Sequence, residues 1–216
     1  MPKDKLQDKI AHTGKCLRIL KKHYPNTRCT LDFKTTHQLM VATILSAQCT
    51  DERVNLVTES LFRKYLSIED FAKADLKELG RDIYTTGFYN NKAKAISESA
   101  RQILKLHNGK IPRKLDDLVK LSGVGRKTGS VILGAGFGLA EGIVVDTHVS
   151  RISQLLGFTS YKDPVRIEKD LMKIIPQNDW IIYAHLLIDH GRAVCKARTP
   201  ECAGCFLSKL CPSARN

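Results

Sequence analysis

A lysine and an aspartate, Lys127 and Asp146, each stand at an expected helix start. The partial positive charge at a helix start favours the neutral form of an amine, so a lysine there can act as a nucleophile. The carboxylate of Asp146 can accept a proton or stabilise a developing positive charge, and it can also cap its helix. Each feature is common in proteins without an activity of this kind, so neither residue alone predicts catalysis.

The turn before the lysine is rich in glycine. Gly123 and Gly125 lack a Cβ, so the backbone between two expected helices can turn tightly and bring its N–H groups close to a phosphate. Arg126 follows the turn and adds a cation. Two helices joined in this way form a helix-hairpin-helix, although glycine-containing turns also join helices that bind no ligand.

The composition is strongly basic. The 216 residues include 35 lysines and arginines but only 22 aspartates and glutamates, which gives a net charge of +13. An excess of this size is typical of nucleic-acid binders but does not by itself exclude another basic protein. The most apolar run, 131–145, contains Glu141 and several glycines, so no membrane span is expected. Residues 1–15 are charged throughout and do not resemble a signal peptide, so we expect the protein to work inside the cell.

Apolar residues recur at helical spacing along most of the chain, and no strand pattern is found, which predicts an all-α protein. Thr35 or Thr36 is expected to cap the second helix, and Asp51 the third, whose apolar side should include Leu56. The first helix is expected at 6–23, and later helices at 75–84, 91–107, 115–121, 126–137, 147–156, 164–175 and 179–192.

Four of the seven cysteines, Cys195, Cys202, Cys205 and Cys211, are grouped near the C terminus with the spacing C-x6-C-x2-C-x5-C. In a reducing compartment, four thiolates hold either a zinc ion or an iron–sulfur cluster rather than disulfides. The spacing does not decide between the two. Zinc sites are common, but they usually pair two CxxC elements, and only one is present here.

Together these motifs resemble the endonuclease III family of base-excision DNA glycosylases. The family's hairpin, Gly/Pro-rich segment and aspartate correspond to 121–127, 133–142 and Asp146, and the segments 46–51 and 86–93 and the cysteine tail also match in order. The resemblance therefore extends over nearly the whole chain. The chain departs from many relatives at Cys49, Phe88 and Gly129, where those relatives carry alanine, leucine or isoleucine, and alanine; these changes bear on substrate choice rather than on the reaction.

The resemblance implies a fold of two helical domains. A six-helix barrel with the helix-hairpin-helix would span 29–140, and a discontinuous helical domain carrying a C-terminal 4Fe-4S loop would combine 1–28 and 141–216. Lys127 and Asp146 would then face each other across the interdomain cleft.

The resemblance also assigns roles to the tail and to two loops. It favours a 4Fe-4S cluster over zinc on the four cysteines, with Lys196 and Arg198 in the loop between the first two ligands binding DNA phosphates. Gln48 and Phe88 match the residues that fill the space left by a flipped nucleotide, by hydrogen bonding to the orphaned base and by wedging between base steps. His148 is expected to make a structural hydrogen bond.

The activity implied is that of a bifunctional DNA glycosylase and AP lyase. Lys127 would attack C1′ of an oxidised pyrimidine nucleotide and form a Schiff base, after which β-elimination cuts the strand 3′ to the abasic site; Asp146 would assist with its charge. The partner would be double-stranded DNA with damaged bases or abasic sites. We expect a monomer, in the cytoplasm and close to the nucleoid, without a membrane.

Three alternatives remain. An adenine-mismatch glycosylase of the same superfamily lacks the Schiff-base lysine and usually has a further C-terminal domain, so Lys127 and the chain's end at Asn216 disfavour it. A non-catalytic DNA-binding module with a metal knuckle would not need Asp146. An iron–sulfur electron carrier would leave the hairpin and the basic charge unexplained.

Overall fold

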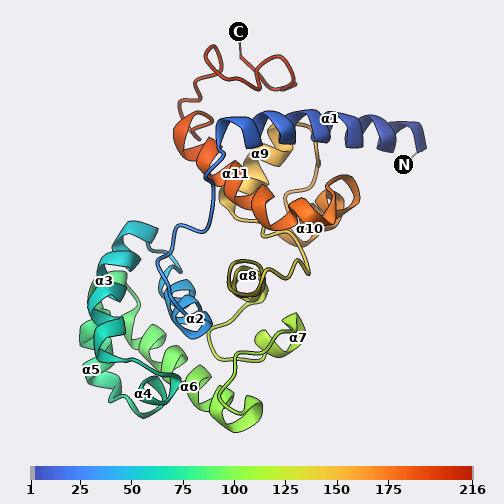
Figure 1. Ribbon diagram of the computed structural model, residues 1–216. Coiled ribbons are helices and arrows are strands. Elements are labelled where there is room, and N and C mark those ends of the chain that lie inside the picture. The colour runs from blue at the N-terminus through green and yellow to red at the C-terminus, as the bar shows by residue number, and fades with distance from the viewer. Residues whose placement is uncertain (1–2, 216) are drawn as a thin grey trace. The chain divides into compact units, whose positions relative to one another are not determined.

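The computed structural model describes the backbone of residues 3–215 and the side chains of residues 5–215. The chain divides into two compact units (Figure 1): unit 1 contains Met1–Arg28 and Gly142–Asn216, and unit 2 contains Cys29–Glu141. Residues 3–215 contain helices and no strand, so the all-α prediction is confirmed. Of the helices in this range, none combines the length and the apolar character that crossing a bilayer requires.

Unit 2 is built around one apolar helix. Helix α2 is hydrophobic on every side, and Leu39, Met40 and Val41 are completely buried, as expected for a helix surrounded by others. It contacts α3, α6, α8 and η2. The elements of the unit are α2 (Thr36–Leu45), α3 (Asp51–Lys64), α4 (Ile68–Lys73), α5 (Leu76–Asp82), the 3₁₀-helix η1 (Tyr84–Thr86), α6 (Tyr89–His107), α7 (Leu115–Leu118), α8 (Arg126–Val131) and the π-helix η2 (Ile132–Gly136).

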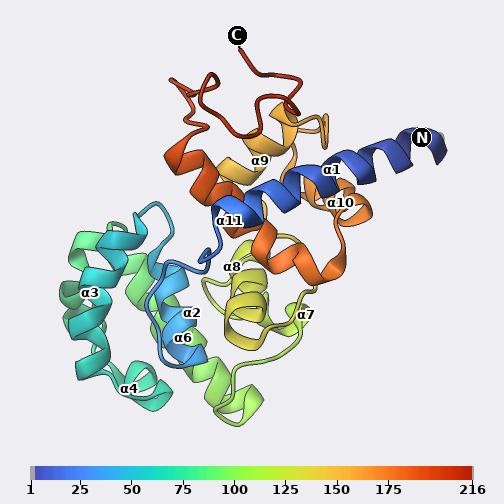
Figure 2. The same cartoon turned by 45° about the horizontal axis from the view of Figure 1, so that its top comes forward.

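Unit 1 joins the two ends of the chain in a second core. Leu20 of α1 and Tyr183 and Leu186 of α11 are fully buried there. The elements are α1 (Lys3–His23), α9 (Thr147–Leu155), α10 (Pro164–Ile174), the 3₁₀-helix η3 (Gln177–Asp179) and α11 (Trp180–Ala193). After α11 the chain forms a tail of turns without a helix, which is drawn in red in Figure 2.

Two expectations about α3 are wrong. Its N-cap is Thr50, whose Oγ1 accepts a hydrogen bond from the Arg53 N–H at 3.3 Å, and Asp51 is the first helical residue. Both residue types cap well, and an acid in the first turn still stabilises the helix dipole. Leu56 is 65 % exposed, because the buried stripe of α3 runs through 54, 57, 58 and 61 and leaves position 56 outside it.

Two other predicted helices also differ from the structure, and one helix was not predicted. The segment 126–137 is not one α-helix, because it widens into a π-helix at Ile132–Gly136, where glycines are frequent. The helix expected at 115–121 ends at Leu118. Helix α4 was not expected at all; its six residues are too few to show a clear period, but a capping box of Ser67 and Asp70 secures its start.

Candidate active site

The hairpin between α7 and α8 is anchored by apolar side chains and shaped by glycine. Leu121 and Val124 are buried in the unit 2 core. Gly123 has φ +73°, and a Cβ added there would lie 2.7 Å from the Cβ of Ala95 on α6. Glycine is therefore required at 123 both by the backbone conformation and by the packing of the turn against α6.

Gly125 serves a different purpose in the same turn. Its backbone is extended, and a Cβ added to it would have no atom within 4 Å, so the fold of unit 2 does not require glycine there. It is the N-cap of α8 and offers no side chain to the first N–H groups of the helix. The side chains of Arg126 and Lys127 follow and are exposed. The lysine thus lies at the start of α8, as the sequence predicts.

Asp146 lies at the start of α9 in unit 1. Its Oδ1 accepts a hydrogen bond from the Val149 N–H at 2.7 Å, which makes it the N-cap of the helix. The cap uses one carboxylate oxygen and orients the group, so capping leaves the second oxygen for another partner.

His148, two residues later, packs against α11. Its Nδ1 is buried without a hydrogen-bond partner among the described residues, so the expected structural hydrogen bond is not found at this atom. A Cβ added to Gly191 would lie within 3 Å of that nitrogen, so glycine is what lets α11 approach the imidazole. Burial lowers the pKa of His148, with Asp146 acting in the opposite direction.

Gln48 and Phe88 lie on two loops of unit 2. Both side chains are exposed, Phe88 by 63 %. Both residues adopt left-handed backbone conformations, with φ 54° for Gln48 and 48° for Phe88. Such conformations are uncommon outside glycine and often mark functional loops.

Lys92 connects these loops and was not predicted as a site residue. Its Nζ donates hydrogen bonds to the carbonyl oxygens of Leu45 at 2.8 Å and Thr86 at 2.7 Å. The sequence carries a signal for it: Lys92 stands four residues before Ile96, on the buried side of α6, where it is the only charged residue.

The four tail cysteines line one pocket, together with residues of α9 and α11. Burial and then the neighbouring cysteines raise the pKa of the Cys205 thiol, as expected for thiols close enough to repel each other when ionised. The Leu207 N–H donates to Cys205 Sγ at 3.4 Å, and Arg151 Nη1 donates to Cys195 Sγ at 3.5 Å. Such donors and a cation suit an anionic thiolate cluster, and in this respect the residues fit an iron–sulfur group. Among the described residues, however, no three His, Cys, Asp or Glu side chains are already arranged to hold a metal ion.

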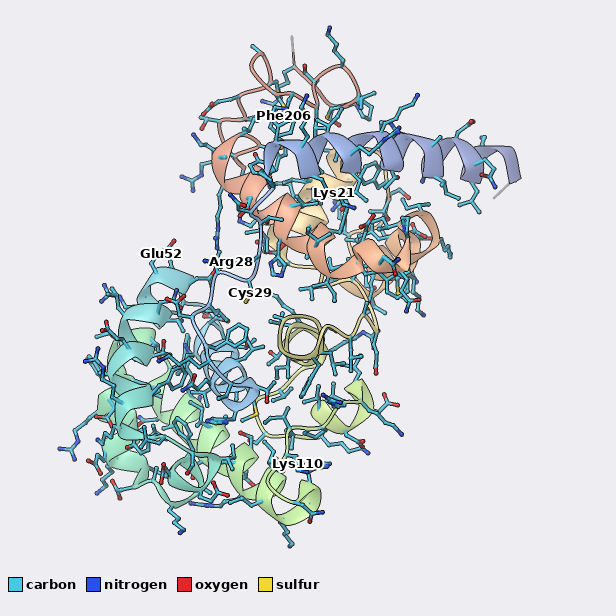
Figure 3. All side chains as sticks on the ribbon, in the orientation of Figure 1. Lys21, Arg28, Cys29, Glu52, Lys110 and Phe206 are labelled. Carbon is cyan, nitrogen blue, oxygen red and sulfur yellow. The ribbon has the colours of Figure 1, made fainter. Side chains whose placement is uncertain are left out.

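The tail is fixed to unit 1 by an aromatic contact as well. Phe206, labelled in Figure 3, stacks on His23 at the end of α1 with ring centroids 3.8 Å apart. In the loop between the first two cysteines, Lys196 forms an ion pair of 2.7 Å with Glu201, whereas Arg198 is exposed. The pair is exposed and therefore weak, so a phosphate can compete for the lysine.

Comparison with known proteins agrees with this arrangement. Residues 41–177 match the model of the HhH-GPD superfamily of base excision DNA repair proteins. Endonuclease III of Synechocystis sp. is 50 % identical over 211 residues, covering 98 % of this chain and 96 % of the relative. The chain belongs to the endonuclease III family.

Solved structures of the family include complexes with DNA. A non-covalent endonuclease III–DNA complex matches with a TM-score of 0.90 and 42 % identity, covering 95 % of this chain and 96 % of that one. A trapped covalent endonuclease III–DNA intermediate with an estranged adenine matches equally well. This relationship also indicates an iron–sulfur cluster for the cysteine tail, since endonuclease III proteins are its relatives over nearly their full length.

Proposed function

We propose that this chain is a bifunctional DNA glycosylase and AP lyase of base excision repair, which removes oxidised pyrimidines and cleaves 3′ to the resulting abasic site. The observation that carries the proposal is Lys127 at the start of α8, directly after the glycine hairpin, in a chain 42 % identical to an endonuclease III trapped covalently on DNA.

Binding begins with the phosphate backbone. The N–H groups around Gly123 and Gly125, with the cation of Arg126, hold phosphates near the lesion. The damaged nucleotide must leave the base stack before its sugar can be reached, at a cost of a few kcal/mol. Gln48 and Phe88 fill the vacated space from their two exposed loops, the amide pairing with the orphaned base and the ring wedging between base steps.

Lys127 supplies the covalent step. Its neutral amine attacks C1′, the bond from C1′ to the base breaks, and the base leaves with the electron pair and a proton. Opening of the sugar gives an imine between the lysine nitrogen and C1′. Loss of a proton from C2′ then expels the 3′ phosphate, which cuts the strand, and water releases the lysine.

Asp146 supplies the complementary charge. A carboxylate oriented by its cap on α9 stabilises, while ionised, the positive charge that develops on the sugar as the base departs. It then accepts the proton that the lysine nitrogen loses once its bond to C1′ has formed. Lys127 belongs to unit 2 and Asp146 to unit 1.

The cysteine tail contributes to DNA binding by holding a basic loop in a fixed place. We propose that Cys195, Cys202, Cys205 and Cys211 hold a 4Fe-4S cluster, whose four thiolate bonds fix the path of the chain from 195 to 211. Lys196 and Arg198, on the loop fixed at both ends, then bind DNA phosphates. The chain acts as a monomer on damaged duplex DNA, inside the cell and close to the nucleoid.

Borohydride trapping tests the nucleophile. With duplex containing an abasic site or an oxidised pyrimidine, the wild-type protein should give a covalent protein–DNA adduct, because borohydride reduces the imine to a stable amine. Lys127→Gln should lose both the adduct and strand cleavage while its affinity for the duplex changes little, since one cation among many contributes a small share of binding. Full trapping by this variant would place the nucleophile elsewhere.

Asp146→Asn is the matched variant for the carboxylate. Asparagine keeps the size and the capping oxygen, so the stability of α9 should be nearly unchanged. Base release in a single turnover should slow by roughly 100-fold or more, as is typical when an acid–base or electrostatic group is removed. Full activity would reduce Asp146 to a helix cap.

A further inference from the structure

Lys92 is a buried lysine without a carboxylate partner among the described residues. Its side chain is on the buried side of α6 and only 5 % exposed, and its ammonium is held by two carbonyl oxygens. Burial lowers the pKa of Lys92, with the Cys49 thiol acting in the opposite direction. Burying a charged group costs free energy, and an apolar residue would fill the same place at a lower cost in free energy. The position of the ammonium therefore calls for an explanation.

The two acceptors are the ends of two helices. Leu45 is the last residue of α2, and Thr86 is the last residue of η1. Carbonyl groups at helix ends lack intrahelical partners and carry partial negative charge, which a cation stabilises. Lys92 thus caps both helices at once and fixes the distance between two segments that are far apart in sequence.

Both ends lead directly into the loops described above. Gln48 follows Leu45 by three residues, and Phe88 follows Thr86 by two. Among residues 3–215, three non-glycine residues have positive φ: Gln48, Phe88 and Asn108. Asn108 is a helix C-cap, where this conformation is usual. The other two need their surroundings to hold them, and Lys92 provides a contact that the two loops share.

We propose that Lys92 is a positioning residue that sets the spacing of the Gln48 and Phe88 loops, so that both side chains enter the DNA together when a nucleotide is flipped. This inference rests on the proposed function, because it needs Gln48 and Phe88 to act on DNA. It adds a residue that touches neither the DNA nor the reacting sugar, and it explains why α6 carries a lysine on its buried side.

The experiment compares two abasic-site substrates. One is an intact duplex, and the other has a gap in the strand opposite the abasic site, where no base has to be replaced. Lys92→Met keeps most of the aliphatic stem and removes the donors. We expect single-turnover cleavage of the intact duplex to fall roughly ten- to hundredfold, as for other small displacements of positioned groups, while cleavage of the gapped substrate stays within about threefold of wild type.

Lys94→Met is the matched control. Lys94 is on the same helix but exposed, so the same chemical change removes a charge without touching the loops, and both substrates should be cleaved as by wild type. A 2-aminopurine placed opposite the abasic site provides a second measurement. Its fluorescence should rise on binding of wild type and of Lys94→Met, because insertion unstacks it, and should change little with Lys92→Met.

The outcomes test the role of Lys92 and the role of the two loops separately. Equal loss on both substrates, or no loss on either, would overturn the positioning role of Lys92. If Lys92→Met does not fold, Lys92→Gln keeps a polar group but reaches only one carbonyl, and it must show the same selective loss for the role to stand. A double variant with Gln48→Ala and Phe88→Ala tests the proposed function separately: if it cleaves the intact duplex normally, the two loops do not act on DNA, whatever Lys92 does.

Discussion

Gly123 and Gly125 stand two positions apart in one turn, yet the protein needs them for different reasons. Gly123 is held at φ +73° against Ala95, so its role is in the fold. Gly125 has an ordinary backbone conformation and open space around it, so the reason for glycine lies outside the isolated chain. A phosphate close to the backbone is such a reason, because a Cβ would keep it away.

Substitution of the two glycines should therefore have different effects, one on the stability of the protein and the other on its affinity for DNA. Gly123→Ala should lower the free energy of unfolding by roughly 1–3 kcal/mol, because the new methyl group meets Ala95 and the backbone is strained. Gly125→Ala should leave stability unchanged or raise it slightly, since its φ of −83° suits alanine, but it should weaken binding to all duplexes alike. Denaturant unfolding and fluorescence anisotropy measure the two effects. Unchanged affinity in Gly125→Ala would make the hairpin a purely structural turn.

At the scale of elements, helices with clear periods could be predicted from the sequence. The starts of α8 and α9 follow from residue type alone, and with them the places of Lys127 and Asp146. The cap of α2 was predicted at Thr35 or Thr36, and the structure has Thr35. The prediction that Asp51 caps α3 was wrong by one residue, because Thr50, directly before it, is an equally good cap.

Features that depend on tertiary contacts were beyond sequence patterns. The left-handed conformations of Gln48 and Phe88 arise at residues that show no such preference, and the two acceptors of Lys92 come from distant segments. The close approach of α11 to His148 likewise depends on Gly191, which follows His148 by 43 residues in the sequence.

The cysteine tail is the element whose structure would depend most on the proposed cluster. Residues 194–215 contain no helix, and Leu207 is the one apolar side chain in them that is fully buried, so the tail has little core of its own. In the proposed cluster, metal–thiolate bonds would supply the folding free energy that apolar burial does not.

Removing one ligand should therefore release the tail. Purified wild-type protein should be brown and contain iron and sulfide, and Cys202→Ser should lose the visible thiolate-to-iron absorption and gain rapid amide exchange over 195–211. Cys29→Ser is the control, since Cys29 belongs to unit 2 and packs against that unit's core. A colourless wild-type protein with one zinc ion would overturn the cluster assignment.

At the scale of the whole molecule, the net charge of +13 is the dominant feature for DNA binding. Each phosphate that the protein neutralises releases counterions, so the logarithm of the affinity should fall with the logarithm of the salt concentration by about 0.9 per phosphate. Only cations that face DNA contribute to this slope. Lysines already held by carboxylates on another surface add to the net charge without adding to the slope.

Two single substitutions separate these classes of cation. Arg198→Gln removes an exposed cation from the loop between the first two cysteines, and the salt slope for abasic-site duplex should become shallower by about 0.9. Lys64→Gln removes the same charge from a lysine paired with Glu78 at 2.8 Å and Asp82 at 2.6 Å, and the slope should stay as in wild type. Anisotropy titrations over a series of salt concentrations measure both. If Arg198→Gln and Lys64→Gln change the slope equally, the protein binds DNA through its overall charge, and the loop fixed by the cysteines has no phosphate of its own.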